Sequence, residues 1–265
     1  MSWIEAFILG LIQGLSEFLP ISSSGHLELG GVLFGLQDPD GYFTFNIMVH
    51  GATFLSVLVV FRKDIAHILG SCLQFTWNSE TRLVVMLLVS AIPVAIVGLL
   101  FEEQIESLFQ GRIIFVGCML LLTATILFLT QFTTKQHKEI NIVRALLIGL
   151  AQTIAVLPGI SRSGATIATA LFLGVDREKA VRFSFLMVLI PIFGANFLKI
   201  LRLSHDASAS GIGTTPLIIG TITAFISGLI ACRWMLKIVA KGQLKYFSIY
   251  CLLAGIAAIV FGLVL

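Results

Sequence analysis

Two stretches of this chain are variants of one pattern: residues 6–36 read AFILGLIQGLSEFLPISSSGHLELGGVLFGL, and residues 145–175 read ALLIGLAQTIAVLPGISRSGATIATALFLGV. Each stretch is mostly apolar but is interrupted near its middle by proline, serine and glycine. Proline stops a helix because it lacks an N–H group and clashes with the preceding turn. Each stretch is therefore predicted to form two short helices joined by a Ser-rich break.

The two stretches align on both sides of the break. Pro20 pairs with Pro158 after a gap of one residue, and the additional Gly159 restores the register. The first-copy residues that recur in the second copy include Ala6, Gly10, Gln13, Ile21, Ser22, Ser24, Gly25 and Gly35. This agreement indicates an internal repeat. We divide one membrane domain, residues 1–265, into repeat one (1–132) and repeat two (140–265).

The composition places this repeat in a membrane. Hydrophobic residues make up 57% of the 265 residues, charged residues make up 12%, and the mean hydropathy is +1.02. These values leave too little polar surface to cover a soluble globule. The net charge of +3 is small and the basic residues are scattered, so a nucleic-acid partner is excluded.

Six further stretches are apolar enough to cross a bilayer, which takes about 20 residues. They are residues 43–61, 83–101, 113–131, 183–201, 215–235 and 246–265. A broken helix is tolerated at membrane depth only where protein or a water-filled cavity surrounds the break. We therefore interpret the two interrupted stretches as re-entrant hairpins. The predicted fold is an all-α polytopic membrane protein with six transmembrane helices and two re-entrant helical hairpins.

The basic residues predict the orientation, because cytoplasmic loops carry an excess of Lys and Arg. In this topology nearly all Lys and Arg residues lie on one side of the membrane, and only Arg112, Lys199 and Arg202 lie on the other side. Both termini are thereby predicted to be extracytoplasmic. Three spans follow each hairpin, so the second hairpin enters from the opposite face, and the halves form an inverted-topology repeat.

The breaks are candidates for an anion site. In inverted repeats of this kind, broken helices meet near the bilayer midplane and their N-termini face the ligand. Free N–H groups at a helix N-terminus and short hydroxyl side chains both attract phosphate. The predicted substrate-binding residues of the two breaks are Ser22, Ser24, Gly25, Ser161, Ser163, Gly164 and Thr166.

The two copies supply different chemical groups. Repeat one supplies Glu17, Ser23 and His26, whereas repeat two supplies Arg162. An arginine within a membrane is costly and keeps its charge, so it needs a partner. The partner of Arg162 would be either a bound phosphate or a buried carboxylate that joins the two hairpins. The imidazole of His26 is placed to transfer protons or to attack phosphorus, although a structural role is the alternative.

Gln13 and Glu17 form a candidate metal site. They lie four residues apart and project from one helix face towards the break. A carboxylate, substrate phosphate and water are typical ligands of Mg²⁺, and oxygen ligands also suit Ca²⁺. Glu17 as counter-ion to Arg162, and Gln13 as a partner for the broken backbone, are the alternatives. Gln152 recurs in the second copy without a carboxylate.

Four other polar residues are not assigned to the site. Glu28 is given no role. His50, Arg182 and Asn196 are predicted to satisfy helix contacts or to reach the membrane interface.

The motifs at the breaks resemble those of a known family, the undecaprenyl pyrophosphate phosphatases, also called bacitracin-resistance proteins. The family motif Glu-or-Gln-x-x-x-Glu is present at residues 13–17, and Pro-Gly-x-Ser-Arg-Ser-x-x-Thr matches residues 158–166 at every fixed position. The Ser-Ser-x-Gly-His element matches residues 22–26. The resemblance covers nearly the whole chain, which departs from the all-acid form of the first motif at Gln13.

The resemblance implies an enzyme of the bacterial plasma membrane that hydrolyses a C55 polyprenyl diphosphate and returns the monophosphate carrier to peptidoglycan synthesis. Bacitracin would compete indirectly by binding this lipid substrate. Glu17, with Gln13, would hold Mg²⁺ or Ca²⁺, and Arg162 would stabilise the transferring phosphoryl group. Attack by Ser23 with help from His26 is the preferred hypothesis; attack by His26 itself, or by water that it activates, is the rival.

A transporter is the competing hypothesis, because inverted repeats with broken helices are also a transporter architecture. A polyprenyl-phosphate flippase or an anion carrier would use the same serines and the same arginine. The restriction of Glu17, Ser23 and His26 to one copy favours the enzyme, because a carrier has no evident need for all three on one side.

Overall fold

The computed structural model describes residues 1–36, 39–109, 111–133, 137–194, 196 and 213–264, and the regular structure in these ranges is helical. The α-helices are α1 (Trp3–Phe18), α2 (Ser23–Leu33), α3 (Pro39–Val60), α4 (Arg62–Cys72), α5 (Ser79–Leu100), α6 (Glu102–Glu106), α7 (Ile113–Leu129), α8 (Ile142–Ile154), α9 (Arg162–Phe172), α10 (Arg177–Met187), α12 (Thr214–Ala240) and α13 (Lys245–Val264). The predicted all-α class is confirmed.

Five helical segments of the described chain are long and apolar enough to cross a membrane. They are Gly41–Val60, Ser79–Leu100, Ile113–Phe132, Thr214–Val239 and Lys245–Val264. Each coincides with a predicted span, so a multi-pass helical membrane protein is confirmed. The sixth predicted span, residues 183–201, lies partly outside the described residues, and Lys199 and Arg202 lie outside them as well. Asn196 is described and is partly buried.

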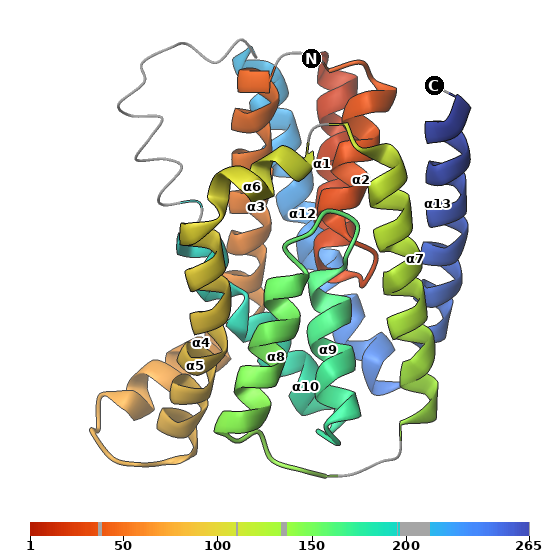
Figure 1. The fold of residues 1–265 in the computed structure, drawn as a ribbon. Coiled ribbons are helices and arrows are strands. Elements are labelled where there is room, and N and C mark those ends of the chain that lie inside the picture. Colours follow the sequence, from red (N-terminus) through yellow and green to blue (C-terminus); the bar gives the residue numbers. More distant parts are fainter. Residues whose placement is uncertain (37–38, 110, 134–136, 195, 197–212, 265) are drawn as a thin grey trace.

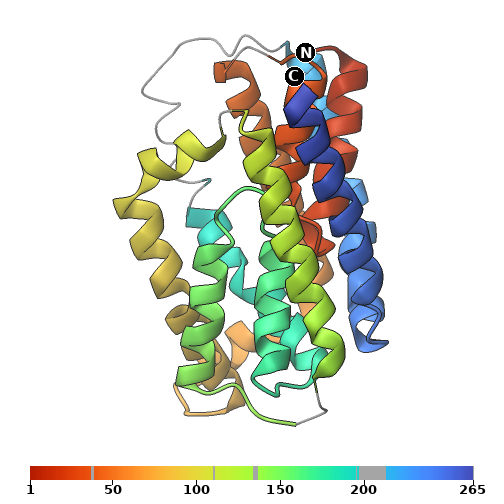
Figure 2. The same cartoon turned by 45° about the vertical axis from the view of Figure 1, so that its right-hand side comes forward.

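The two repeated stretches each form a pair of short helices around a break. Helices α1 and α2 flank the first break, and α8 and α9 flank the second. The breaks meet near mid-height of the molecule, where α1 and α2 extend to one end and α8 and α9 extend to the other (Figures 1 and 2). The two copies therefore have the same local structure and opposite directions.

The same serine cap starts the second helix of each pair. Ser22 Oγ accepts a hydrogen bond from Gly25 N at 3.3 Å, and Ser161 Oγ accepts one from Gly164 N at 3.1 Å. An N-terminal cap of this kind stabilises a helix by about 1 kcal/mol. The Ser-x-x-Gly spacing in both breaks thus explains why each chain segment resumes as a helix directly after its turn.

Matched glycines let the first helix of each pair pack closely against a long helix of the other repeat. A Cβ atom at Gly10 of α1 would lie 2.5 Å from Gly220 O of α12. A Cβ atom at Gly149 of α8 would lie 2.3 Å from Ser90 O of α5. Backbones that approach this closely need small residues at the contact. The two repeats are consequently interleaved and do not form separate halves.

An ion-pair cluster near α4 accounts for Arg182. Its Nη2 lies 3.0 Å from Asp64 Oδ1 of α4 and 3.8 Å from Glu80 Oε2 of α5. The prediction that Arg182 serves a helix contact is therefore confirmed. Helix α4 itself was not predicted, because its charged residues and short length resemble those of a connecting loop.

Candidate active site

The tips of the two hairpins are joined by hydrogen bonds. Gly159 N donates to Ser22 Oγ at 3.2 Å, and Ser163 Oγ donates to Leu19 O at 3.3 Å. A Cβ atom at Gly25 would lie 3.0 Å from Gly159 Cα, so a side chain there would crowd the backbone of the other break. The two breaks, which are far apart in the sequence, therefore form one continuous polar region.

Ser22 is strained at this junction. Its φ of 70° lies in the left-handed region, which a residue with a side chain rarely adopts. Such strain costs of order 1–3 kcal/mol and is tolerated where the surroundings fix the backbone. Hydrogen bonds from Gly25 N and Gly159 N to the Ser22 hydroxyl provide that fixation.

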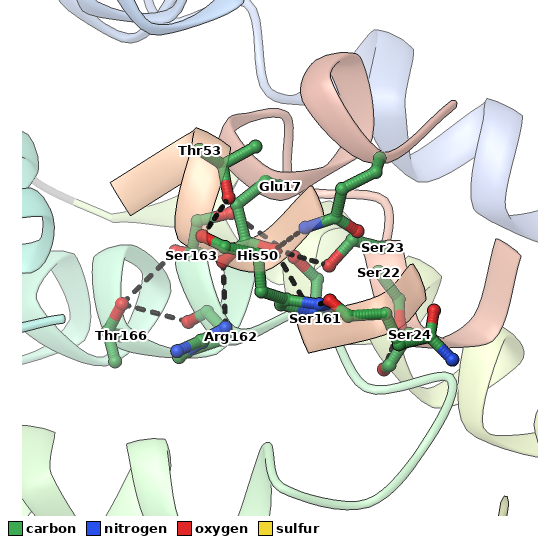
Figure 3. A network of polar contacts seen from close by, with 12 residues as sticks. Glu17, Ser22, Ser23, Ser24, His50, Thr53, Ser161, Arg162, Ser163 and Thr166 are labelled. Carbon is green, nitrogen blue, oxygen red and sulfur yellow. Dashed lines mark hydrogen bonds and ion pairs between the residues drawn. The ribbon is translucent and has the colours of Figure 1, made fainter. Parts of the chain in front are cut away.

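The carboxylate of Glu17 is the centre of the site (Figure 3). Its Oε1 lies 2.8 Å from Arg162 Nη2, which reaches it from the other hairpin. Its Oε2 accepts a hydrogen bond from Ser23 Oγ at 2.6 Å and another from Gln13 Nε2 at 3.0 Å. The Glu17 side chain is only 4% exposed. The structure thus brings together Gln13, Glu17, Ser23 and Arg162, which we call the Glu17 cluster.

His50 also faces this carboxylate, although it was left out of the predicted site. Its Nε2 lies 3.9 Å from Glu17 Oε2, and its Nδ1 donates to Asn46 O at 2.8 Å (Figure 3). The sequence analysis interpreted His50 as a helix contact and did not predict its position beside Glu17. A titratable side chain inside an apolar span was the available signal, but the face of α3 that meets α1 depends on helix packing.

His26 has hydrogen-bond partners that differ from those of Glu17. Its Nδ1 is 2.8 Å from Ser22 O, and its Nε2 is 2.8 Å from the hydroxyl of Tyr250 on α13. The hydrogen-bond partner of Ser23 is Glu17, and within the described residues no hydrogen bond links His26 to Ser23. The predicted help of His26 to Ser23 therefore does not rest on a direct hydrogen bond between their side chains in the described structure.

The serines of the breaks pair within each copy. Ser22 Oγ and Ser24 Oγ are 3.4 Å apart, and Ser161 Oγ and Ser163 Oγ are 3.3 Å apart. Thr166 differs from the other predicted binding residues, because its hydroxyl contacts Arg162 O at 2.9 Å and Ser184 Oγ at 2.5 Å. In this structure Thr166 supports the helix behind Arg162.

Glu28 has a structural contact that the sequence did not indicate. Its Oε1 accepts a hydrogen bond from Gly111 N at 2.5 Å. Gly111 precedes α7, so Glu28 joins the first hairpin to the start of that helix. Glu28 is thereby directed away from the Glu17 cluster.

The residues around Glu17 fit a divalent cation that is held jointly with substrate. Gln13 is fully buried, and its Oε1 has no hydrogen-bond partner in the described part of the chain. A buried oxygen without a partner costs about 1–3 kcal/mol. No group of three His, Cys, Asp or Glu residues able to hold a metal occurs among the described residues. One carboxylate and one amide oxygen suit Mg²⁺ or Ca²⁺ if phosphate and water supply the remaining ligands.

Comparison with known proteins agrees with the motifs. Residues 6–257 match the family described as bacitracin resistance protein BacA. The chain is 49% identical over 262 residues to the undecaprenyl-diphosphatase of Bacteroides fragilis and 50% identical over 264 residues to that of Christiangramia forsetii, with 98% of each chain covered in both cases. It is 36% identical over 266 residues to undecaprenyl-diphosphatase 1 of Bacillus cereus, with 97% of each chain covered. This chain therefore belongs to the bacitracin resistance protein BacA family.

Proposed function

We propose that this chain is a membrane phosphatase that hydrolyses undecaprenyl diphosphate to undecaprenyl phosphate and inorganic phosphate. This activity would recycle the lipid carrier for cell-wall synthesis and confer resistance to bacitracin, which binds the same lipid. The relatives that share nearly the full length of the chain carry the name of this activity. The observation that carries the proposal is the shared carboxylate of Glu17, which holds Arg162 from one hairpin and Ser23 from the other.

The proposed topology places both breaks inside the bilayer of the bacterial inner membrane. We propose six crossings and two re-entrant hairpins, with both termini extracytoplasmic. The opposite directions of the hairpins support this topology, and so does the position of the start of α1 and the end of α13 at one end of the molecule (Figure 1). The lipid substrate would then approach laterally from the membrane.

The proposed reaction has two steps on Ser23. In the first step, Ser23 Oγ attacks the terminal phosphorus, the bond to the bridging oxygen breaks, and undecaprenyl phosphate leaves. The hydroxyl proton passes to Glu17 Oε2, which is 2.6 Å away. In the second step, water attacks the phosphoserine, Ser23 recovers its proton from Glu17, and inorganic phosphate leaves. Help from His26 in proton transfer is part of this proposal, because His26 lies in the first turn of α2 close to Ser23. Direct attack by His26, or by water that it activates, is the rival mechanism.

Arg162 would stabilise the phosphoryl group during both steps. Its guanidinium is oriented by Glu17 and lies at the start of α9, where free N–H groups add to the positive potential. Stabilisation of developing charge is the main contribution a protein makes to phosphoryl transfer. Ser22, Ser24, Ser161 and Ser163 would add hydrogen-bond donors to the phosphate oxygens.

Gln13 and Glu17 are the residues that would hold Mg²⁺ or Ca²⁺. When bound, the ion would neutralise charge on the diphosphate. Gln13 would contribute Oε1, the buried oxygen that otherwise has no partner in the described chain. The amide and the carboxylate lie on one face of α1, so the same helix positions both ligands.

Phosphate release from undecaprenyl diphosphate by the purified protein in detergent tests the proposed function. We expect release by the wild type and loss of release in Arg162→Ala. A folded wild-type protein that releases no phosphate would contradict the proposal and favour a polyprenyl-phosphate carrier, since the inverted hairpins suit a carrier equally well.

A further inference from the structure

The last helix contributes a hydroxyl to the first hairpin. Tyr250 on α13 lies far in the sequence from His26 on α2, yet its hydroxyl is 2.8 Å from His26 Nε2. The two rings are stacked, with centroids 5.6 Å apart and an interplanar angle of 16°. Tyr250 therefore contacts the imidazole both through its ring and through its hydroxyl.

Both ring nitrogens of His26 form hydrogen bonds. Nδ1 lies 2.8 Å from Ser22 O, and a carbonyl oxygen only accepts, so Nδ1 carries a hydrogen. In the neutral ring Nε2 is then the acceptor, and the hydroxyl of Tyr250 donates to it. Contacts at both ends fix the tautomer and the plane of the His26 ring.

The two groups that hold His26 are themselves anchored. Ser22 is fixed to the second hairpin by the hydrogen bond from Gly159 N. The neighbour of Tyr250, Cys251, is fully buried, and its Sγ lies 3.6 Å from Pro20 O in the first break. Successive residues of α13 thus contact the first hairpin on both sides of its break, which sets the position of the Tyr250 hydroxyl.

We propose that Tyr250 is a positioning residue for His26 in the phosphatase reaction. This inference rests on the proposed function and assigns a role to α13, which otherwise supplies no group to the site. His26 lies in the first turn of α2, beside Ser23, where a phosphate would bind. Without the hydroxyl of Tyr250 the imidazole keeps one hydrogen bond and can rotate, so a smaller fraction of molecules holds it in the reactive orientation.

Tyr250→Phe tests this role because it removes the hydroxyl and keeps the stacked ring. We expect kcat to fall by about tenfold with KM within about twofold of wild type, because orientation of a proton-transferring group affects the chemical step. Tyr246→Phe is the matched control, because Tyr246 is also exposed and lies one helical turn before Tyr250 on α13. It should retain wild-type kinetics, since the Tyr246 ring faces the Lys245 ammonium, whose Nζ lies 5.3 Å from the ring centroid.

A double-mutant cycle shows whether Tyr250 acts through His26. In a His26→Ala background, Tyr250→Phe should cause no further decrease in kcat, because residues that act as a unit are not additive. An equal decrease with and without His26 would overturn the proposal. Wild-type kinetics of Tyr250→Phe would overturn it as well.

Nuclear magnetic resonance of ¹⁵N-histidine-labelled protein gives a readout that is independent of activity. We expect the His26 signal, assigned by its loss in His26→Ala, to show hydrogen on Nδ1 in the wild type and a mixture of tautomers in Tyr250→Phe. Identical His26 signals in both proteins would contradict the proposed contact. An inactive wild type with this change in the spectrum would instead contradict the proposed function and leave the contact supported.

Discussion

The guanidinium of Arg162 lies 2.8 Å from the carboxylate of Glu17, and this ion pair joins the two hairpins at their breaks. The Glu17 side chain is 4% exposed and that of Arg162 is 27% exposed. The two interpretations of Arg162, as a lock between hairpins and as a phosphate ligand, are compatible. Arg162 Nη2 donates a hydrogen bond to the Glu17 carboxylate, while the remaining N–H groups of the guanidinium are available to a substrate anion.

Removal of one partner of this pair should destabilise the protein more than removal of both. We expect Arg162→Ala to lower the free energy of unfolding by about 3 kcal/mol, because it leaves the buried Glu17 carboxylate uncompensated. The double variant Glu17→Gln with Arg162→Ala should recover part of this loss. Thermal unfolding in detergent measures both effects, with Arg233→Ala at an exposed position of α12 as the control. Equal stability of Arg162→Ala and Arg233→Ala would show that the pair is energetically unimportant.

Gln13 should determine the cation requirement. We expect Gln13→Glu to lower the Mg²⁺ concentration for half-maximal activity by about tenfold, because a second carboxylate strengthens an oxygen site for a hard cation. Gln13→Leu should raise that concentration. Gln152→Leu is the matched control, because Gln152 occupies the equivalent position of the second copy, where Val156 replaces the carboxylate.

Direct binding separates this effect from catalysis. Titration with Mn²⁺, followed by electron paramagnetic resonance, should give tighter binding in Gln13→Glu than in the wild type and weaker binding in Gln13→Leu. Unchanged binding in both variants would exclude Gln13 as a ligand.

His50 should contribute to the reaction although the motifs do not include it. We expect His50→Ala to lower kcat/KM by about tenfold, because the imidazole is a polar neighbour of Glu17 at 3.9 Å and its loss changes the surroundings of the reacting carboxylate. His67→Ala, at an exposed position of α4, is the control. Steady-state phosphate release measures both, and equal values for the two variants would remove His50 from the site.

Local sequence was sufficient to predict the helix pairs and the residues at their tips. Pro20 and Pro158 mark the breaks, and the Ser-x-x-Gly caps restart the helices, so both features depend on neighbouring residues. The partnership of Glu17 with Arg162 was one of two alternatives, because a membrane arginine requires an anion. The repeat supplied the further information that the two residues lie on copies of the same element.

The contributions of His50 and Tyr250 depend on packing and were missed for that reason. Each is one of several polar residues on a long, mostly apolar helix, and the sequence does not specify which face of α3 or α13 turns towards the first hairpin. Thr166 shows the converse case. It belongs to a specific motif, yet its hydroxyl contacts Ser184 of α10, so membership of a motif did not predict a position within the Glu17 cluster.

The central claim is that Ser23, held by Glu17, is the nucleophile of a lipid diphosphatase. The most direct test is the rate of phosphate release from undecaprenyl diphosphate by Ser23→Ala, compared with wild type and with Ser227→Ala, whose hydroxyl bonds to Thr223 O within α12. We predict a decrease of at least about a thousandfold for Ser23→Ala and a wild-type rate for Ser227→Ala. Release by Ser23→Ala within about tenfold of wild type would contradict the claim and assign the attack to His26 or to water.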